Sequence, residues 1–241
     1  MSEGDYAPTR HLVVEELRKL CLELGENGLA LPGEPKLARV LGVGRATLRD
    51  ALTRLEAEGL ILRRKGADTI VNTAAFRLGA RIDLRVDFAD ILRDCGFGAA
   101  MVLLEQERAP LTAEAGDALG IAAGAPALRT LKRWDADGRP VMVAVDWVPL
   151  FNSTATPDPT RPVFELAAEL GGEEIAWEMA CPGAVIVEDE IASTLQLAPA
   201  SPVWTLERVG IGRSGRRSFF AFEYHIPSVV QYGFIRSLQR P

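Results

Sequence analysis

Two arginines, Arg45 and Arg49, lie one helical turn apart at the start of a run with helical periodicity. This spacing places both guanidinium groups on one side of a helix, next to the arc formed by Leu48 and Leu52. Arginine can donate two hydrogen bonds to guanine O6 and N7, and recognition helices present such side chains from their N-terminal turns. The pair therefore predicts a helix that reads the major groove of DNA, with Thr47 as a further contact.

The residues before this run predict a second helix that would hold it in place. Leu37, Ala38 and Leu41 follow the spacing of a short amphipathic helix, and Gly42 ends that helix before the arginine run begins. A short break that contains glycine between two helices is typical of a helix-turn-helix.

A basic hairpin is expected next. Gly59 ends the second helix, and two β-prone runs follow around Gly66, with Lys65 at the tip. Between Lys36 and Lys65 there are eight basic and three acidic side chains, although the whole chain carries a net charge of −6. A local basic stripe favours phosphate contacts, so Lys36, Lys65 and Gly66 join the expected DNA contacts. The alternative is a helix pair whose charges only solvate its surface.

The stretch from Leu31 to Val71 resembles the winged helix of GntR-type transcriptional regulators. The shared residues are Leu31-Pro32, Glu34, Leu37-Ala38, Leu41-Gly42-Val43, Arg45, Thr47-Leu48-Arg49, Ala51-Leu52, Leu55, Glu58-Gly59-Leu60-Ile61, Gly66 and Thr69. The resemblance implies a winged helix-turn-helix that binds double-stranded DNA. The chain departs from the family pattern at a DNA-contacting arginine, a helix-capping serine and a wing glycine, where it has Pro35, Gly44 and Asp68.

Length and composition predict a two-domain globular protein. The 241 residues are 48% hydrophobic and 25% charged, which is an ordinary globular balance. No apolar run is long enough for a membrane helix and no signal peptide is seen, so we expect a cytoplasmic protein without membrane contact. Cys21, Cys95 and Cys181 are far apart, which predicts buried free thiols and neither a metal site nor a cofactor.

The expected domains are a DNA-binding domain at 1–72, a linker at 73–85 and a second domain at 86–241. A first helix, from about Pro8 to Leu24, would complete the DNA-binding core. The linker is expected to be the only covalent path between the domains. The second domain alternates β-prone runs with helical segments, which predicts an α+β fold on an antiparallel sheet. The runs are 99–107, 127–134, 140–148, 184–190, 203–211 and 217–226, and the helical segments are 87–94, 112–119, 162–170 and 188–196.

An internal repeat occupies much of the second domain. The segment that starts at Leu119 aligns with the one that starts at Leu195, and each is expected to form a helix, a strand, a glycine turn and a strand. The aligned pairs include Pro126 with Pro202, Lys132 with Arg208, Val145 with Phe222 and Asp146 with Glu223. Two such units can pair their sheets around a pseudo-twofold axis and leave a cleft between them for a small ligand.

The second domain resembles the UTRA effector-binding domain of HutC-like regulators, whose fold is similar to chorismate lyase. The resemblance rests on the turn at 136–141, the strand end at 146–149 and the segment that starts at Leu195. It implies a small-molecule effector, often a sugar phosphate, and a dimer. Many members carry an R-x-R pair and an acid where this chain has Lys132, Trp134 and Ala144, which disfavours a sugar phosphate here.

The acids of the two repeats are the expected core of the effector site. Asp146 and Glu223 would face one cleft and favour a cationic or polyhydroxy ligand, or a basic partner such as Lys132 or Arg208. The expected effector contacts are Phe88, Lys132, Trp134, Asp146, Glu223 and Tyr224. The alternatives are an internal salt bridge and a solvated sheet face.

Together these features predict a homodimeric transcriptional regulator that binds a palindromic operator. The simplest form is a repressor, and a small effector changes its affinity for DNA. One alternative is a regulator with a degenerate effector site that acts through a protein partner. The other is a chorismate-lyase-like enzyme. Two histidines, without a nucleophile–histidine–acid grouping or a metal cluster, argue against catalysis, so no catalytic residue is assigned.

Overall fold

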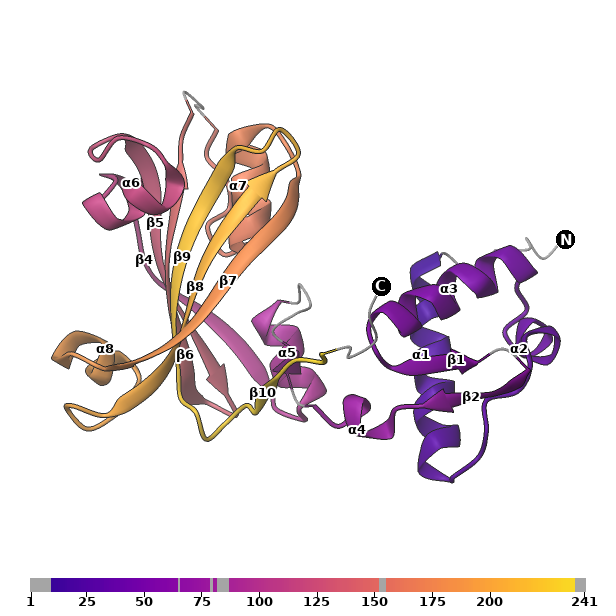
Figure 1. Cartoon of the computed structure of the whole chain (residues 1–241). Helices are drawn as coiled ribbons and strands as arrows, with labels where there is room; N and C mark the ends of the chain where they lie inside the picture. Colours follow the sequence, from indigo (N-terminus) through magenta and orange to yellow (C-terminus); the bar gives the residue numbers. More distant parts are fainter. Residues whose placement is uncertain (1–9, 65, 79, 82–86, 152–154, 237–241) are drawn as a thin grey trace, which may run out of the picture. The chain divides into compact units, whose positions relative to one another are not determined.

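The computed structural model of the chain describes residues 10–64, 66–78, 80–81, 87–151 and 155–236 (Figure 1). Its internal contacts divide the chain into two units. Unit 1 consists of residues 1–83 together with 233–241, and unit 2 consists of residues 84–232. The C-terminal residues therefore return to the first unit. The expectation that residues 73–85 form the only covalent path between the domains is wrong, because the chain passes between the units twice.

Three helices and a hairpin build unit 1. The helices are α1 (Arg10–Glu26), α2 (Glu34–Val40) and α3 (Arg45–Ala57), and the hairpin strands are β1 (Ile61–Arg64) and β2 (Ala67–Val71). Leu17, Leu37 and Leu48 are almost fully buried in one apolar cluster that all three helices share. The sequence prediction of a winged helix-turn-helix is confirmed, although the expected helix start at Pro8 lies outside the described residues.

Glycines set the two ends of α3. Gly42 has a positive φ of 64° in the turn that precedes the helix, and Gly59 has a φ of 70° just after it. Both conformations favour glycine because a Cβ atom would clash with the backbone. Gly44 caps the N-terminus of α3 without a side-chain hydrogen bond. The replacement of a capping serine thus leaves these first N–H groups without a side-chain acceptor.

The expected linker begins with ordered structure that belongs to unit 1. It contains α4 (Thr73–Phe76) and β3 (Ala80–Arg81), and β3 forms a two-stranded sheet with β10 (Tyr232–Gly233). Ala75 is buried in the unit 1 cluster, and Ile235 from the C-terminal segment packs against the same cluster. Apolar residues at both positions anchor these segments, which a search for periodicity could not reveal.

Unit 2 is built on one six-stranded antiparallel sheet with the order β4-β5-β6-β9-β8-β7. The strands are β4 (Ala99–Pro110), β5 (Pro126–Ala136), β6 (Arg139–Pro149), β7 (Ile175–Ile186), β8 (Pro202–Gly212) and β9 (Arg217–His225). The helices are α5 (Phe88–Asp94), α6 (Ala113–Leu119), α7 (Val163–Gly171) and α8 (Asp189–Thr194). The prediction of an α+β fold with an antiparallel sheet is confirmed.

The helices cover both faces of this sheet (Figure 1). On one face, α7 packs on Leu128 and Val148, and Phe88 of α5 contacts Trp134 edge to face. On the other face, α6 packs against Trp147 and α8 against Val143. We refer to these as the α5/α7 face and the α6/α8 face. Side chains that alternate along each strand are therefore divided between two separate cores.

The repeat covers the whole unit. Strand β7 begins 76 residues after β4, and β8 begins 76 residues after β5, so each copy runs helix, strand, helix, strand, strand. The copies join where β6 pairs with β9, which makes one continuous sheet. The expected cleft between two separate sheets is absent from the described part of the unit. Strand β7 also begins at Ile175, nine residues before the predicted run, because Pro182 and Gly183 obscure its pattern.

Candidate functional site

The DNA-contact candidates of unit 1 lie on α2, on α3 and in the hairpin. Arg45 and Arg49 are exposed on the first turns of α3, and Lys36 is exposed on α2. Thr47 is half-buried and Gly66 is exposed at the tip of the hairpin. Lys65, the remaining candidate, lies outside the described residues. This arrangement leaves the N-terminal turns of α3 free to approach a partner, as readout of the major groove requires.

The two arginines of α3 differ in their surroundings. The Nε atom of Arg49 lies 2.9 Å from Oε2 of Glu34, and this hydrogen bond raises the pKa of Arg49. Arg45 has no hydrogen-bond or ion-pair partner within the part of the chain that the structure describes. An exposed ion pair is worth little, so Arg49 can exchange its carboxylate partner for phosphate or guanine at small cost.

One basic residue of the hairpin has a structural role. Arg63 donates from Nε to Glu56 Oε2 at 2.8 Å, and from its backbone N–H to Glu56 Oε1 at 2.9 Å. Burial favours a raised pKa for Glu56, but Arg63 outweighs it and lowers that pKa. These hydrogen bonds connect the first hairpin strand to α3. The guanidinium group of Arg63 therefore already has a partner within unit 1.

Unit 2 has a small cavity on its α5/α7 face. Phe88, Lys132, Trp134, Asp146 and Glu223 line it, which brings together five of the six expected effector contacts. Other lining residues are Asp87, Met142, Ala144, Pro162, Val163, Phe164 and Arg208. The space for solvent is about 30 Å³, enough for about one or two water molecules. The cavity as it stands is therefore largely filled by its own side chains.

Tyr224 does not line this cavity. It follows Glu223 directly on β9, and successive residues of a strand point to opposite faces. It packs instead on the α6/α8 face, against the cluster that contains Leu131 and Val143. Trp147 lies on that face as well. The expectation that Tyr224 shares a ligand with Glu223 is therefore not met.

An ion pair occupies one half of the cavity. Lys132 Nζ lies 3.0 Å from Asp146 Oδ2, and both side chains are almost completely buried. Lys132 Nζ also donates to the carbonyl oxygen of Arg161 at 2.9 Å, and Thr130 donates to Asp146 Oδ2 at 3.0 Å. Each charge thus has at least two polar partners, which offsets the cost of its burial.

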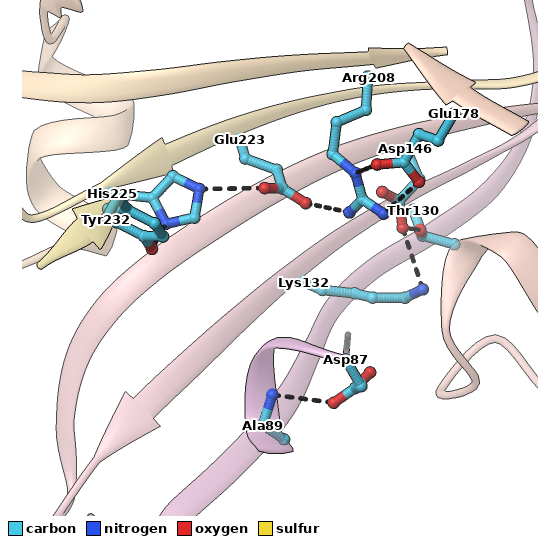
Figure 2. A network of polar contacts seen from close by, with 10 residues as sticks. All are labelled: Asp87, Ala89, Thr130, Lys132, Asp146, Glu178, Arg208, Glu223, His225 and Tyr232. Carbon is cyan, nitrogen blue, oxygen red and sulfur yellow. Dashed lines mark hydrogen bonds and ion pairs between the residues drawn. The ribbon is translucent and has the colours of Figure 1, made fainter. Parts of the chain in front are cut away.

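A larger network occupies the other half (Figure 2). Arg208 forms an ion pair with Glu223 and binds Glu178 through two hydrogen bonds of 2.8 and 2.7 Å. Glu223 Oε2 lies 3.0 Å from His225 Nε2, and the hydroxyl of Tyr232 lies 2.5 Å from His225 Nδ1. Five side chains are thereby linked in a row from β7 to the end of unit 2.

The charges of this network stabilise one another. Burial alone would raise the pKa of Glu223, but Arg208 and His225 outweigh it and lower the pKa to about 2. Burial alone would lower the pKa of Arg208, but Glu223 and Glu178 outweigh it and raise the pKa. Both groups are therefore charged at neutral pH.

The two ion pairs are equivalent in the repeat. Lys132 aligns with Arg208, and Asp146 aligns with Glu223. Lys132 faces Ala144 across β5 and β6, and Arg208 faces Ala221 across β8 and β9. The internal salt bridge, considered as an alternative for the acids, is thus what the structure contains in both copies. The two carboxylates do not offer a free negative cleft to a cation.

Sequence reasoning missed part of the network. It considered Arg208 only as a basic partner, and it did not include Glu178, His225 or Tyr232. The repeat was the available signal for Arg208, because its equivalent Lys132 was already a candidate. Glu178 lies on the part of β7 that was not predicted, and Tyr232 contacts His225 through a turn of the chain after β9 that has no periodic pattern.

Other functional groups are not brought together. In the described ranges, no group of three histidine, cysteine or acidic residues is placed to hold a metal ion.

Cys21 is buried, and burial raises its pKa to about 11, whereas Cys95 is half-buried and Cys181 is exposed. The prediction of buried thiols is therefore wrong for Cys181, which lies on the edge strand β7. Within the same ranges, we find no helix with the length and hydropathy to span a bilayer.

Two family profiles match the chain. The profile described as "Bacterial regulatory proteins, gntR family" covers residues 9–71, and that of the UTRA domain covers residues 95–228. The first match contains the helix-turn-helix and hairpin of unit 1. The second contains the sheet of unit 2 and most of its polar network.

Individual relatives agree with these profiles. The chain is 32% identical over 119 residues to "Uncharacterized HTH-type transcriptional regulator RB1450" of Rhizobium meliloti (strain 1021). That alignment covers 49% of this chain and 48% of the relative, so it spans about half of each. Over 217 residues the chain is 23% identical to "HTH-type transcriptional regulator Rv0792c" of Mycobacterium tuberculosis (strain ATCC 25618 / H37Rv), covering 85% of this chain and 77% of that protein.

The fold also has a solved counterpart. The crystal structure of a possible transcriptional regulator, YydK of Bacillus subtilis, superposes with a TM-score of 0.77 and 17% sequence identity. The match covers 96% of this chain and 100% of that one. At this identity the likeness concerns the fold, which the two proteins share over both units.

Proposed function

Because the chain belongs to the gntR family of bacterial regulatory proteins and carries a UTRA effector-binding domain, we propose that it is a repressor controlled by a small molecule. Unit 1 would bind an operator, and unit 2 would bind the effector that changes operator affinity. Repression is the simplest outcome, because a protein bound across a promoter excludes other proteins from that DNA. Since its target is bacterial DNA, we place it in the cytoplasm.

The surface around the start of α3 supports DNA readout. Arg45 and Arg49 are exposed where a recognition helix enters the major groove, and Lys36 is exposed on the preceding helix. Arg45 can donate two hydrogen bonds to guanine, and Lys36 can neutralise a phosphate. We assign Lys65 and Gly66 to the wing contact, and Thr47 to a supporting contact beside the arginines.

The observation that carries the effector proposal is the pair of equivalent buried ion pairs facing one cavity. Buried pairs stabilise a fold less than apolar residues of similar size, so their presence in both copies suggests a functional role. Of the charged side chains that line the cavity, Asp87, Asp146 and Glu223 are acidic, whereas Lys132 and Arg208 are basic. This balance, with Asp146 and Glu223 already paired, favours a polyhydroxy effector over an anionic one.

An effector would have to open the cavity, because the present space accommodates only about one or two waters. Hydroxyl groups of a ligand could replace the contacts that Asp146 and Glu223 make with Lys132 and Arg208. The ligand would then select an arrangement of unit 2 in which these pairs are separated. A small molecule can shift an equilibrium only by its difference in affinity for the two states, so this exchange is the proposed source of control.

We further propose a homodimer assembled through unit 2 on a palindromic operator. Trp177, Met179 and Val185 are exposed on alternate positions of the edge strand β7, on its α6/α8 face. Such an apolar stripe is typical of a protein interface. Pro182 lacks an N–H on the free edge, which disfavours strand addition, so the side chains of the stripe would form the contact.

A second candidate is a regulator that acts through a protein partner. It is favoured by one observation, namely that the ion pairs satisfy each other and nearly fill the cavity. A domain that has lost its ligand would have that appearance. A panel of metabolites that never changes the melting temperature would favour this candidate.

We do not propose a reaction. Among the described residues that line the cavity, none is a serine or a cysteine, and His225 of the adjoining network already contacts Glu223 and Tyr232. A covalent mechanism would need a nucleophile beside a base.

The experiment that tests the proposal is capture of genomic DNA fragments by the purified full-length protein, followed by sequencing. We expect enrichment of one motif with twofold symmetry, whose half-sites lie about 34 to 36 Å apart or a multiple of that distance. Enrichment of a motif without symmetry would contradict the dimer, and uniform recovery of all fragments would contradict specific regulation.

A further inference from the structure

The C-terminal segment connects two well-packed places in the molecule. Tyr232 is the last residue of unit 2, and the next residue, Gly233, already belongs to unit 1. Ile235 packs against the apolar cluster of unit 1. Only two residues therefore separate a side chain held in one unit from a side chain held in the other.

In unit 2, Tyr232 is fixed by its ring and by its hydroxyl. The ring stacks on Trp204 with centroids 4.3 Å apart, and the hydroxyl lies 2.5 Å from His225 Nδ1. Burial raises the pKa of Tyr232, so the hydroxyl keeps its proton and can donate it. Tyr232 is thus packed within unit 2, and the position of its hydroxyl depends on the position of His225.

His225 transmits this contact to the cavity. Glu223 is ionised and can only accept hydrogen bonds, so His225 Nε2–H must donate to it across 3.0 Å. In a neutral imidazole, Nδ1 is then left to accept from Tyr232, and one tautomer serves both contacts. Glu223 also forms an ion pair with Arg208 at the cavity wall. A change in the position of Glu223 would therefore affect both the cavity and the contact between His225 and Tyr232, where the chain leaves unit 2.

In unit 1, the segment ends beside the recognition helix. A Cβ atom at Gly59 would lie 2.6 Å from Cγ2 of Ile235, so the isoleucine packs directly on the residue that follows α3 and its cap, Glu58. Arg81, on the other passage between the units, donates from Nη1 to the carbonyl oxygen of Glu58 at 2.6 Å. Both passages are therefore attached to the C-terminal corner of the helix that carries Arg45 and Arg49.

From this geometry we propose that Tyr232 is a positioning residue that transmits the state of the effector site. It holds the C-terminal segment, residues 226–236, in place while Glu223 is paired with Arg208. An effector that takes Glu223 from Arg208 moves His225, loosens Tyr232 and releases the segment that Ile235 anchors on Gly59. Release alters the support of α3 and thereby its fit to DNA. The inference rests on the proposed effector-controlled function and adds the residues that carry the signal.

The repeat supplies an internal control. Asp146 holds an equivalent buried pair with Lys132, but the position equivalent to His225 is Val148. The Asp146 half of the cavity therefore has no imidazole that could link its ion pair to the point where the chain leaves unit 2. Signal transmission is expected from one half of the cavity only.

The test is hydrogen exchange followed by mass spectrometry on the full-length protein without DNA or ligand. Three variants are compared with the wild type: Glu223→Gln, Tyr232→Phe and the matched control Asp146→Asn. We expect the first two to speed amide exchange about tenfold or more in residues 226–236, with a smaller increase around 55–62. Asp146→Asn should speed exchange in both segments less than Glu223→Gln does, because the Lys132–Asp146 pair has no histidine link to Tyr232.

Equal changes in Asp146→Asn and Glu223→Gln would overturn the proposal, because general loosening of unit 2 would then explain them. Wild-type exchange in Tyr232→Phe would overturn it as well, and this variant keeps the stacked ring if Glu223→Gln fails to fold. The measurement uses neither operator nor effector. Its failure would leave the proposed regulator intact, and failure of the DNA capture would leave this coupling intact.

Discussion

Val145 of β6 lies directly opposite Phe222 of β9 in the antiparallel register, and the two residues are also equivalent positions of the repeat. The axis that relates the two copies must therefore pass between them, at the centre of the sheet. Ala144 consequently lies opposite Glu223, and Asp146 lies opposite Ala221. The small residues at these positions leave room above the sheet, where the two ion pairs meet the cavity.

The first prediction concerns the buried pair Lys132–Asp146. Asp146→Ala should lower the free energy of unfolding by about 3 to 5 kcal/mol, because it leaves the charge of Lys132, which is 1% exposed, without its partner. The double change Lys132→Met with Asp146→Leu should cost less than half as much, since it removes both charges and keeps the volume. Urea denaturation measures both values. A double variant that loses as much as the single one would show that the polar contacts, and not the unpaired charge, determine the cost.

The second prediction concerns acid. The pKa of Glu223 is lowered to about 2 in the fold from an ordinary value of 4.5. A lowered pKa means that the ionised form stabilises the fold fully above pH 4.5, and that this contribution is lost as the pH falls toward 2. Glu223→Gln should therefore flatten the loss of unfolding free energy between about pH 5 and pH 3.

The control for the acid experiment is Glu174→Gln, which removes a carboxylate that is 75% exposed. It should retain the wild-type dependence on pH. If Glu223→Gln loses stability with falling pH as steeply as the wild type, the ion pair with Arg208 does not govern acid stability.

The third prediction concerns DNA readout by α3. Arg49→Ala and Arg45→Ala should each weaken binding to the captured operator by about 1 to 3 kcal/mol and leave the melting temperature unchanged. Arg93→Ala, an exposed arginine on α5 in unit 2, is the charge-matched control. Fluorescence anisotropy measures the affinities. Wild-type affinity in the double variant at Arg45 and Arg49 would remove these residues from the interface.

The fourth prediction concerns the dimer. Trp177→Glu combined with Met179→Glu should convert the protein to a monomer, because carboxylates in the apolar stripe of β7 would be buried without partners. Leu104→Glu, on the opposite edge strand β4, should leave the assembly unchanged. Light scattering at micromolar concentration distinguishes the two states. A monomeric wild type, or a dimer that survives the double change, would place the interface elsewhere or remove it.

Local patterns were sufficient to predict the helix-turn-helix and hairpin of unit 1 and the central hairpins of unit 2. The helices around Arg45 and Arg49 keep their apolar spacing, and the hairpins keep equivalent charges at Lys132 and Arg208. Strand β7 was predicted too short because Pro182 and Gly183 are unusual in strands, and only an edge position tolerates them.

The remaining differences depend on tertiary structure. Tyr224 was grouped with Glu223 although neighbours on a strand face opposite ways, so an alternation argument could have separated them. No such argument leads from Tyr232 to His225, or from Ile235 to Gly59. The first contact forms within unit 2 after β9, and the second forms because the chain then returns to unit 1; neither leaves a periodic signal in the sequence.

The central claim is that a ligand in the cavity of unit 2 changes the affinity of unit 1 for DNA. The most direct measurement is an anisotropy titration of the captured operator, with and without the compound that most raises the melting temperature. It is made on the wild type and on the Lys132→Met/Asp146→Leu variant. We predict a change of about 5- to 150-fold in the wild type and none in the variant. An equal change in both proteins, or no change with any compound, would contradict the account.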